Sequence, residues 1–193
     1  MPQHKVGFII GSIASGSINR QLSKALVKLA PPELQLHEIP IKDLPFYSYD
    51  HDSNFPAVAT AFKQAISDAD ALLFITPEYN RSIPGVLKNA IDWASRPYGK
   101  NAFAHKPAGV VGASVGAIGT ALSQAHLRGV LNYLDVPQLQ QPEVYLHFKK
   151  DLVGADGSVS DSGTEAFLRK YMAAFAEFVA QHAARPQNTS EKR

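Results

Sequence analysis

The sequence contains no cysteine, and this absence excludes several classes of protein. Disulfide scaffolds, cysteine-ligated zinc sites, iron–sulfur clusters and thiol-dependent enzymes all need cysteine thiols. The chain has 193 residues, which is long enough to bury the core of a single domain without such cross-links. We therefore expect one domain, in a reducing compartment such as the cytoplasm.

The sequence also lacks a strong charge imbalance and a long hydrophobic run. Nineteen Lys and Arg residues stand against 17 Asp and Glu residues, for a formal net charge of +2, so no basic block favours nucleic acid. The apolar run at residues 6–10 is too short for a signal peptide or a membrane span. The seven histidines show no metal-ligand spacing. We expect no nucleic-acid partner, no membrane attachment and no metal.

The chain alternates extended apolar runs with helix-spaced stretches. Runs at 6–10, 71–75 and 108–113 are wholly apolar or small, as in buried parallel strands. Mixed extended stretches at 34–39 and 139–146 are typical of strands nearer the sheet edges. Helical spacing between these runs predicts right-handed βαβ crossovers. The fold class is therefore α/β, a three-layer sandwich with a five-stranded parallel sheet in the order 2-1-3-4-5.

The last helix is expected to begin at Ser162, in a capping-box pattern with Glu165. We assign residues 1–184 to the folded domain and expect the tail at 185–193 to be disordered.

A polar loop follows the first apolar run and leads directly into a predicted helix. It reads Gly-Ser-Ile-Ala-Ser-Gly-Ser-Ile-Asn-Arg over residues 11–20. Unpaired N–H groups at a helix N-terminus bind phosphate well. The Walker A pattern fails, because Ser17 stands in place of the lysine and Ile18 in place of the magnesium-binding hydroxyl. The dinucleotide fingerprint fails as well. An ordinary serine-capped helix is the alternative.

A second polar loop, Thr-Pro-Glu-Tyr-Asn-Arg-Ser-Ile-Pro-Gly, follows the third strand over residues 76–85. Its two prolines make it stiff. Tyr79 and Asn80 could then present an aromatic ring, an amide and backbone groups to a flat ligand. The alternative is plain turn chemistry, with Ser82 capping the next helix.

A third loop follows the fourth strand, and its sequence Gly-Ala-Ser-Val-Gly over residues 112–116 matches the nucleophile elbow of α/β-hydrolases. A serine hydrolase would use Ser114 with an aspartate and either His147 or His182, which follow in the required order. The alternative is a glycine-rich turn where the backbone must come close to another group.

Together the three loops resemble the NADPH-dependent FMN reductase family of flavodoxin-like proteins, which includes quinone, chromate and azo-dye reductases. The most specific part is the stretch from Thr76 to Trp93, and the resemblance spans nearly the whole chain. It implies a flavodoxin-like fold, bound FMN, NADPH or NADH as co-substrate, and a homodimer or homotetramer with the flavin sites near its interface.

The resemblance also implies which residues bind the cofactor, and it implies no catalytic side chain because the flavin carries the chemistry. Arg81 stands where several relatives have Tyr or Gly, which bears on acceptor preference. The residues implied to hold the FMN phosphate are Ser12, Ser17, Ile18 and Asn19, with Arg20 nearby. Those implied to line the isoalloxazine are Pro77, Glu78, Tyr79 and Asn80, with Ser114 and Gly116 closing the other side.

The implied activity is that of an FMN-dependent NAD(P)H oxidoreductase. Hydride passes from NAD(P)H to FMN and then to a quinone, azo, flavin or chromate-type metal-oxyanion acceptor, in a ping-pong sequence. Backbone N–H groups around Glu78 would stabilise charge on the reduced flavin. Two alternatives stay open: a small serine hydrolase using Ser114, and a non-catalytic flavodoxin-type electron carrier. The near-neutral charge argues against the carrier, because carriers usually dock through an acidic surface.

Overall fold

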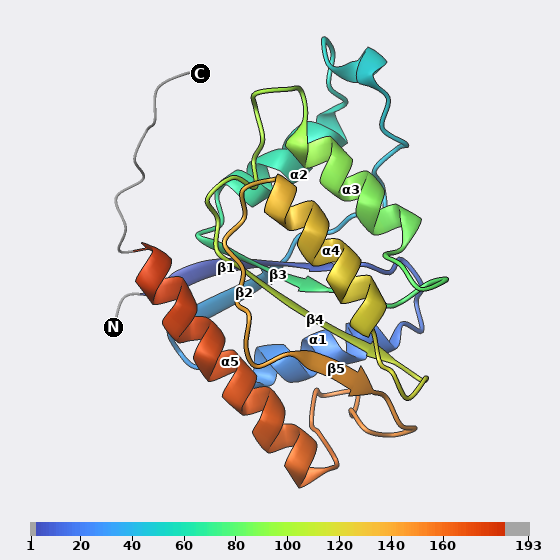
Figure 1. Ribbon diagram of the computed structural model, residues 1–193, viewed down its shortest axis with the longest axis vertical. Coiled ribbons are helices and arrows are strands. Elements are labelled where there is room, and N and C mark those ends of the chain that lie inside the picture. The colour runs from blue at the N-terminus through green and yellow to red at the C-terminus, as the bar shows by residue number, and fades with distance from the viewer. Residues whose placement is uncertain (1–2, 184–193) are drawn as a thin grey trace.

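A computed structural model describes residues 3–183, so the predicted tail at 185–193 lies outside the described residues. Its five strands form one parallel sheet in the order β2-β1-β3-β4-β5, which confirms the predicted α/β architecture (Figure 1). The strands are β1 (His4–Ile10), β2 (Leu34–Glu38), β3 (Ala71–Ile75), β4 (Ala108–Ser114) and β5 (Val144–His147). The helices are α1 (Ile18–Leu29), α2 (Ala57–Ser67), α3 (Gly85–Ser95), α4 (Ala121–Tyr133) and α5 (Ser162–Ala183), with a short 3-10 helix, η1 (Tyr49–His51).

The helices form two layers with the sheet between them (Figure 1). Helices α1 and α5 pack on one face around a core that includes Leu26 and Phe175, and α2, α3 and α4 pack on the other around Phe74 and Trp93. All five residues of β3 are buried, as expected of a central strand covered on both faces. No helix within residues 3–183 is both long enough and apolar enough to span a bilayer. Because β1, β3 and β4 are parallel neighbours in the sheet, their carboxyl ends meet at one edge.

Two details differ from the sequence-based expectations. The fifth strand is shorter than 139–146, because the chain pairs with β4 at Gln138 and then leaves the sheet until Val144. Pro142 lies in that gap, where its missing N–H breaks no ladder. The cap of α5 is Asp161, whose Oδ2 accepts the Thr164 N–H at 2.7 Å. The short capping side chain thus precedes the predicted position by one residue.

Gly112 in β4 brings this strand unusually close to its neighbours at the carboxyl edge. A Cβ on Gly112 would lie 2.1 Å from the carbonyl oxygen of Thr76 and 2.3 Å from the hydroxyl of Thr120. No side chain fits there, so glycine is required for close approach of backbone to backbone. The loops that follow β3 and β4 are consequently packed directly against one another.

Candidate functional site

The loop between β1 and α1 leaves a row of backbone donors open. Ser17 is the N-cap of the 12-residue helix α1, and its hydroxyl accepts the Arg20 N–H at 3.4 Å. The N–H groups of Ser15, Gly16 and Ile18 have no hydrogen-bond acceptor among the described residues. Such donors, at the positive end of a helix dipole, form an anion site that suits a phosphate.

The side chains of the next two residues, both expected near the phosphate, bind the sheet in the structure. Asn19 is buried, and its amide forms two 2.9 Å hydrogen bonds with the backbone N–H and C=O of Ala113 in β4. The Arg20 guanidinium donates two hydrogen bonds, of 2.8 and 3.0 Å, to the Glu38 carboxylate. These hydrogen bonds raise the pKa of Arg20 above its ordinary value. The two side chains thus fix the start of α1, while the backbone N–H groups before them stay open.

The loop after β3 contains a tight two-residue turn. The backbone groups of Tyr79 and Ser82 exchange hydrogen bonds of 3.0 and 2.9 Å. Between them, Asn80 and Arg81 have φ angles of 51° and 64°, the positive pair that a type I′ turn requires. The turn projects Tyr79 outward with 54% of its surface exposed. An aromatic ring on a rigid turn can therefore form one wall of a ligand site.

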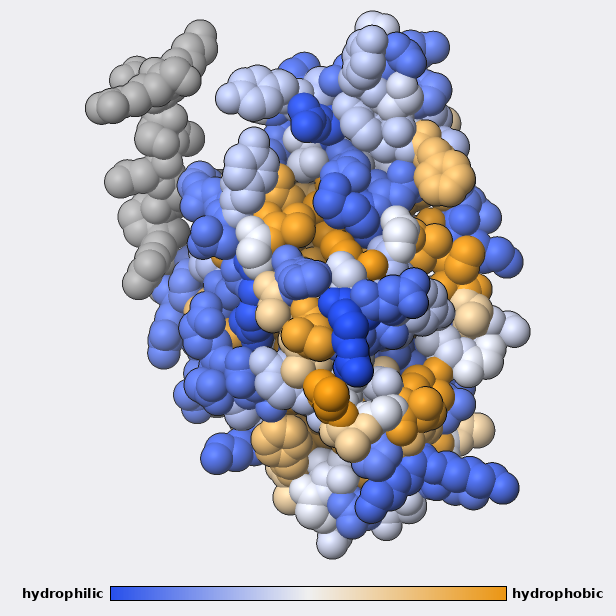
Figure 2. Space-filling model, turned by 45° about the vertical axis from the view of Figure 1, so that its right-hand side comes forward, coloured by the Kyte–Doolittle hydropathy of each residue, from blue (hydrophilic) through white to orange (hydrophobic). Residues whose placement is uncertain are grey.

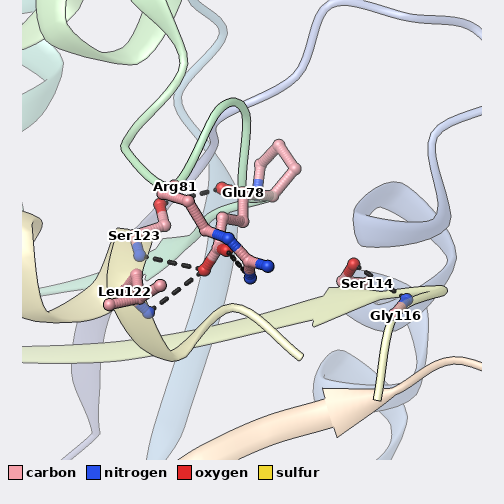
Figure 3. Close-up of polar contacts among 7 residues, drawn as sticks. Glu78, Arg81, Ser114, Gly116, Leu122 and Ser123 are labelled. Carbon is pink, nitrogen blue, oxygen red and sulfur yellow. Dashed lines mark hydrogen bonds and ion pairs between the residues drawn. The ribbon is translucent and has the colours of Figure 1, made fainter. Parts of the chain in front are cut away.

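The Glu78 carboxylate caps the N-terminus of α4 from this loop (Figure 3). Its Oε2 accepts the N–H groups of Leu122 and Ser123, both at 3.1 Å, while Thr120 at the N-cap position supplies no capping side chain. Its Oε1 accepts from Arg81 at 3.2 Å. The carboxylate is occupied by these three donors, so Glu78 can serve a ligand at the carboxyl edge through its backbone rather than as a proton acceptor.

Further side chains of α4 brace the same loop. The Ser123 hydroxyl donates to the Pro77 carbonyl at 2.9 Å and lies 3.2 Å from the Thr76 hydroxyl. His126 Nδ1 lies 2.9 Å from the Ser82 hydroxyl. The N-cap position of α3 is Pro84, so the alternative in which Ser82 caps that helix is wrong. Sequence reasoning missed these bracing residues. They stand 44 to 47 positions from their partners, and no local pattern indicates such pairs.

The loop after β4 is a glycine-rich turn with exposed apolar side chains. The Gly116 N–H donates to the Ser114 hydroxyl at 3.1 Å, and the Gly119 N–H donates to the Gly116 carbonyl at 3.0 Å. Val115 and Ile118 expose 74% and 52% of their surface. These two N–H groups are used within the turn, so Val115 and Ile118 are what the turn presents to a ligand, as apolar contact.

The hydrolase alternative finds no support in the geometry around Ser114. Ser114 ends β4 without the positive φ of a strained elbow. Within residues 3–183, no histidine forms a hydrogen bond to its hydroxyl. His147 lies beside it in register on β5 but has an exposed side chain, and His182 Nδ1 faces the Phe178 carbonyl in α5. A serine nucleophile would have no base here.

Apolar side chains and open donors thus converge on one edge of the molecule. Figure 2, which brings forward the right-hand side of Figure 1, shows apolar groups exposed among hydrophilic ones. The large apolar side chains exposed on the three loops and the start of α4 are Ile13, Tyr79, Val115, Ile118 and Leu122. This arrangement fits FMN, whose phosphate matches the donors of the first loop and whose planar ring matches the apolar walls with backbone groups between them.

Comparison with known proteins gives an independent result. Residues 4–151 match the family described as NADPH-dependent FMN reductase. The chain is 49% identical over 175 residues to a 2-hydroxy-1,4-benzoquinone reductase from Burkholderia sp, covering 91% of this chain and 96% of that protein. It is 42% identical over 177 residues to a quinone reductase from Pseudomonas putida, covering 91% and 95%.

A solved structure has nearly the same fold. FerB from Paracoccus denitrificans, a flavoenzyme described as an NAD(P)H:(acceptor) oxidoreductase, superimposes with a TM-score of 0.89 at 43% sequence identity. The match covers 93% of this chain and 98% of FerB.

Proposed function

The chain belongs to the NADPH-dependent FMN reductase family, and from that premise we propose that it is a quinone reductase that would bind FMN and use NAD(P)H as the reductant for its acceptor. Membership makes it an FMN-dependent oxidoreductase rather than a carrier without catalysis. The acceptor class and the ping-pong order are parts of the proposal. Related activities on azo dyes, free flavins or chromate would use the same open ring face.

The observation that supports this function most directly is the set of open N–H groups in the loop after β1. The N–H groups of Ser15, Gly16 and Ile18 are open to a ligand, because no acceptor among the described residues occupies them. A phosphate provides an acceptor, with charge complementary to the α1 dipole. FMN bound there supplies two-electron redox chemistry. The chain's own groups bind the phosphate, orient the ring and present backbone donors where negative charge develops.

Tyr79 would form one wall of the ring site and would also border the space where NAD(P)H and the acceptor bind in turn. Because its ring is half exposed on a rigid turn, it shapes access without taking part in hydride transfer. We expect Tyr79→Leu to change relative rates among quinones more than it slows flavin reduction. Unchanged selectivity across several quinones would contradict this role.

The decisive experiment is a visible spectrum of the purified protein with FMN, followed by anaerobic addition of NADPH. We expect a bound flavin that bleaches on NADPH and regains its colour on addition of a quinone. Initial rates at several fixed quinone concentrations should give parallel double-reciprocal lines, as a ping-pong sequence requires. No FMN binding at micromolar concentration would overturn the proposal, and intersecting lines would overturn only the ping-pong order.

A matched pair of variants tests the phosphate site itself. Ser15 is exposed, so it can accept a larger side chain, and Ser15→Asp and Ser15→Asn match each other in size and differ mainly in charge. We expect Ser15→Asp to weaken FMN binding about tenfold relative to Ser15→Asn, because the added carboxylate repels the phosphate at close range. Equal FMN affinities for the two variants would place the phosphate elsewhere.

We also propose that the protein is a homodimer or homotetramer located in the cytoplasm. A groove of about 1080 Å³ runs between α3 and α4 and is lined by Ile91, Val130 and the highly exposed rings of Tyr98 and Tyr133. The groove also carries polar side chains such as Lys88 and Asp92, and exposed aromatic rings beside a groove of mixed lining are typical of a protein interface. Tyr133→Ser should weaken association in sedimentation experiments, while Phe167→Ser on α5 should not. A monomeric wild type would contradict this part.

A further inference from the structure

Arg81 adopts a strained backbone conformation at the edge of the proposed flavin site. Its φ angle of 64° is left-handed, which costs a residue with a side chain about 1 kcal/mol and costs glycine almost nothing. Asn80, the other central residue of the turn, tolerates this region much better. Strain that persists on a loop beside a binding site is a reason to look for a role of the side chain.

The guanidinium of Arg81 is only partly neutralised. It makes one contact, from Nη1 to Glu78 Oε1 at 3.2 Å, and its side chain is 64% exposed whereas that of Glu78 is 7% exposed. The Glu78 carboxylate also accepts two N–H groups of α4, so much of its charge is balanced by that helix terminus. Four of the five guanidinium N–H donors therefore stay available to solvent or to a ligand.

On the three loops that follow β1, β3 and β4, at residues 11–17, 76–84 and 114–120, Arg81 and Glu78 are the only charged residues. In Figure 3 the Arg81 guanidinium extends away from its turn, on the side that faces Ser114. The charge that these three loops themselves present to the space between them is therefore an exposed cation next to a buried, capped anion.

We propose that Arg81 makes the acceptor site selective for electron acceptors that carry a negative charge, such as quinones with a sulfonate or an ionised hydroxyl group. This inference rests on the proposed function and deepens it. The reaction is unchanged: the quinone takes two electrons as hydride from NAD(P)H by way of the cofactor and a proton from water, and forms the hydroquinone. Arg81 contributes to binding through charge-assisted hydrogen bonds to the anionic substituent.

The test compares two acceptors that share a ring system, 1,2-naphthoquinone-4-sulfonate and neutral 1,2-naphthoquinone. The measured quantity is the ratio of their kcat/KM values for the FMN-loaded enzyme, so differences in intrinsic reactivity cancel between variants. We expect Arg81→Gln to lower this ratio about three- to fivefold, the effect of losing one exposed charge contact. Arg81→Lys should retain most of the preference, because it keeps the charge.

The matched control is Arg169→Gln. Arg169 is similarly exposed, at 59%, and also pairs with one glutamate, but it lies on α5 across the sheet. It should leave the ratio unchanged. In the wild type, raising the salt concentration should lower the ratio by screening, and in Arg81→Gln salt should have little effect.

Flavin binding and bleaching by NADPH are recorded for every variant. A wild type that binds no FMN overturns the proposed function. A ratio unchanged in Arg81→Gln, with flavin reduction intact, overturns only the inference about Arg81. The inference is equally overturned if Arg81→Gln changes the preference for NADPH over NADH and leaves the quinone ratio unchanged, because the cation would then serve the 2′-phosphate.

Discussion

The loops after β1 and β3 lie at the same edge of the sheet but are held in opposite ways. The β3 loop is fixed from outside, by the Glu78 carboxylate on the N-terminus of α4 and by the hydroxyl of Ser123 on the Pro77 carbonyl. The β1 loop has two long internal hydrogen bonds, from the Ala14 N–H to the Ser12 hydroxyl and from the Ser17 N–H to the Ala14 carbonyl. Its end is anchored by the buried Asn19, and its backbone donors at Ser15 and Gly16 stay open. One loop has most of its polar groups satisfied before any ligand arrives, and the other does not.

This difference indicates what each loop has to do. A site that stabilises charge on a ring needs donors already in place, so its loop must be rigid. A phosphate site can leave its donors unpaired in water, because the ligand supplies both acceptor and charge. The α4 helix therefore serves as a brace for the ring side of the site.

The largest effect is expected from Gly112→Ala. The new methyl group would meet the Thr76 carbonyl at 2.1 Å, and neither this backbone atom nor the buried Thr120 can move away cheaply. We expect the free energy of unfolding to fall by about 3 kcal/mol or more, measured by urea denaturation. The control, Gly163→Ala at the exposed start of α5, has its nearest atom at 3.5 Å and should be close to neutral. A wild-type stability for Gly112→Ala would show that the two loops are not held tightly together.

The next effect is expected from Asn19→Leu, which removes the anchor of the open loop. The substitution leaves the N–H and C=O of Ala113 buried without partners. We expect a loss of about 2–3 kcal/mol in the free energy of unfolding. Asn132→Leu on the exposed side of α4 should change stability by less than about 0.5 kcal/mol. If Asn19→Leu weakens FMN binding without lowering stability, the amide serves the phosphate directly and the anchoring role is wrong.

FMN itself gives the third test, because the two loops should respond to it differently. Free FMN at tenfold its Kd should add about 1.4 kcal/mol to the free energy of unfolding. In hydrogen exchange, the amides of Ser15, Gly16 and Ile18 should change from fast to protected. The amides of Tyr79 and Ser82, already paired with each other, should change little. Equal protection of both loops would mean that the β3 loop is also ordered by the ligand.

The fold could be predicted from the sequence because its signals are local. The apolar runs at 6–10 and 71–75 are strands in the structure, and the polar loop after the first run leads into helix α1 as predicted. The start of α5 at Ser162 is also as predicted, although its capping side chain is that of Asp161. The boundary prediction failed for the last strand, which the gap around Pro142 shortens.

The site was only partly predictable from the sequence. Its loops follow local sequence patterns, whereas the contacts that brace them join residues far apart in the chain. The patterns located all three loops at the correct edge. They could not show that the Asn19 amide binds Ala113, 94 positions away, or that the Glu78 carboxylate is taken up by α4. Ser123 and His126 lie on a helix with no unusual sequence, and only the packing of α4 against the β3 loop gives them a role.

The smallest effect is expected from Glu78→Gln, which keeps the size of the capping group and removes its charge. One amide oxygen can still accept from Leu122 and Ser123, but the amide NH₂ then faces the Arg81 guanidinium without an acceptor. Losing the charge at the α4 terminus should cost about 1 kcal/mol of the free energy of unfolding. The matched control is Glu165→Gln, in the first turn of α5, which also pairs with an arginine but is 41% exposed. Because solvent screens that pair, its replacement should cost less than about 0.5 kcal/mol. If the two variants lose equal stability in the same urea titration, the contact between Glu78 and α4 contributes no more than an ordinary surface charge, and the distinction between a braced loop and an open one fails.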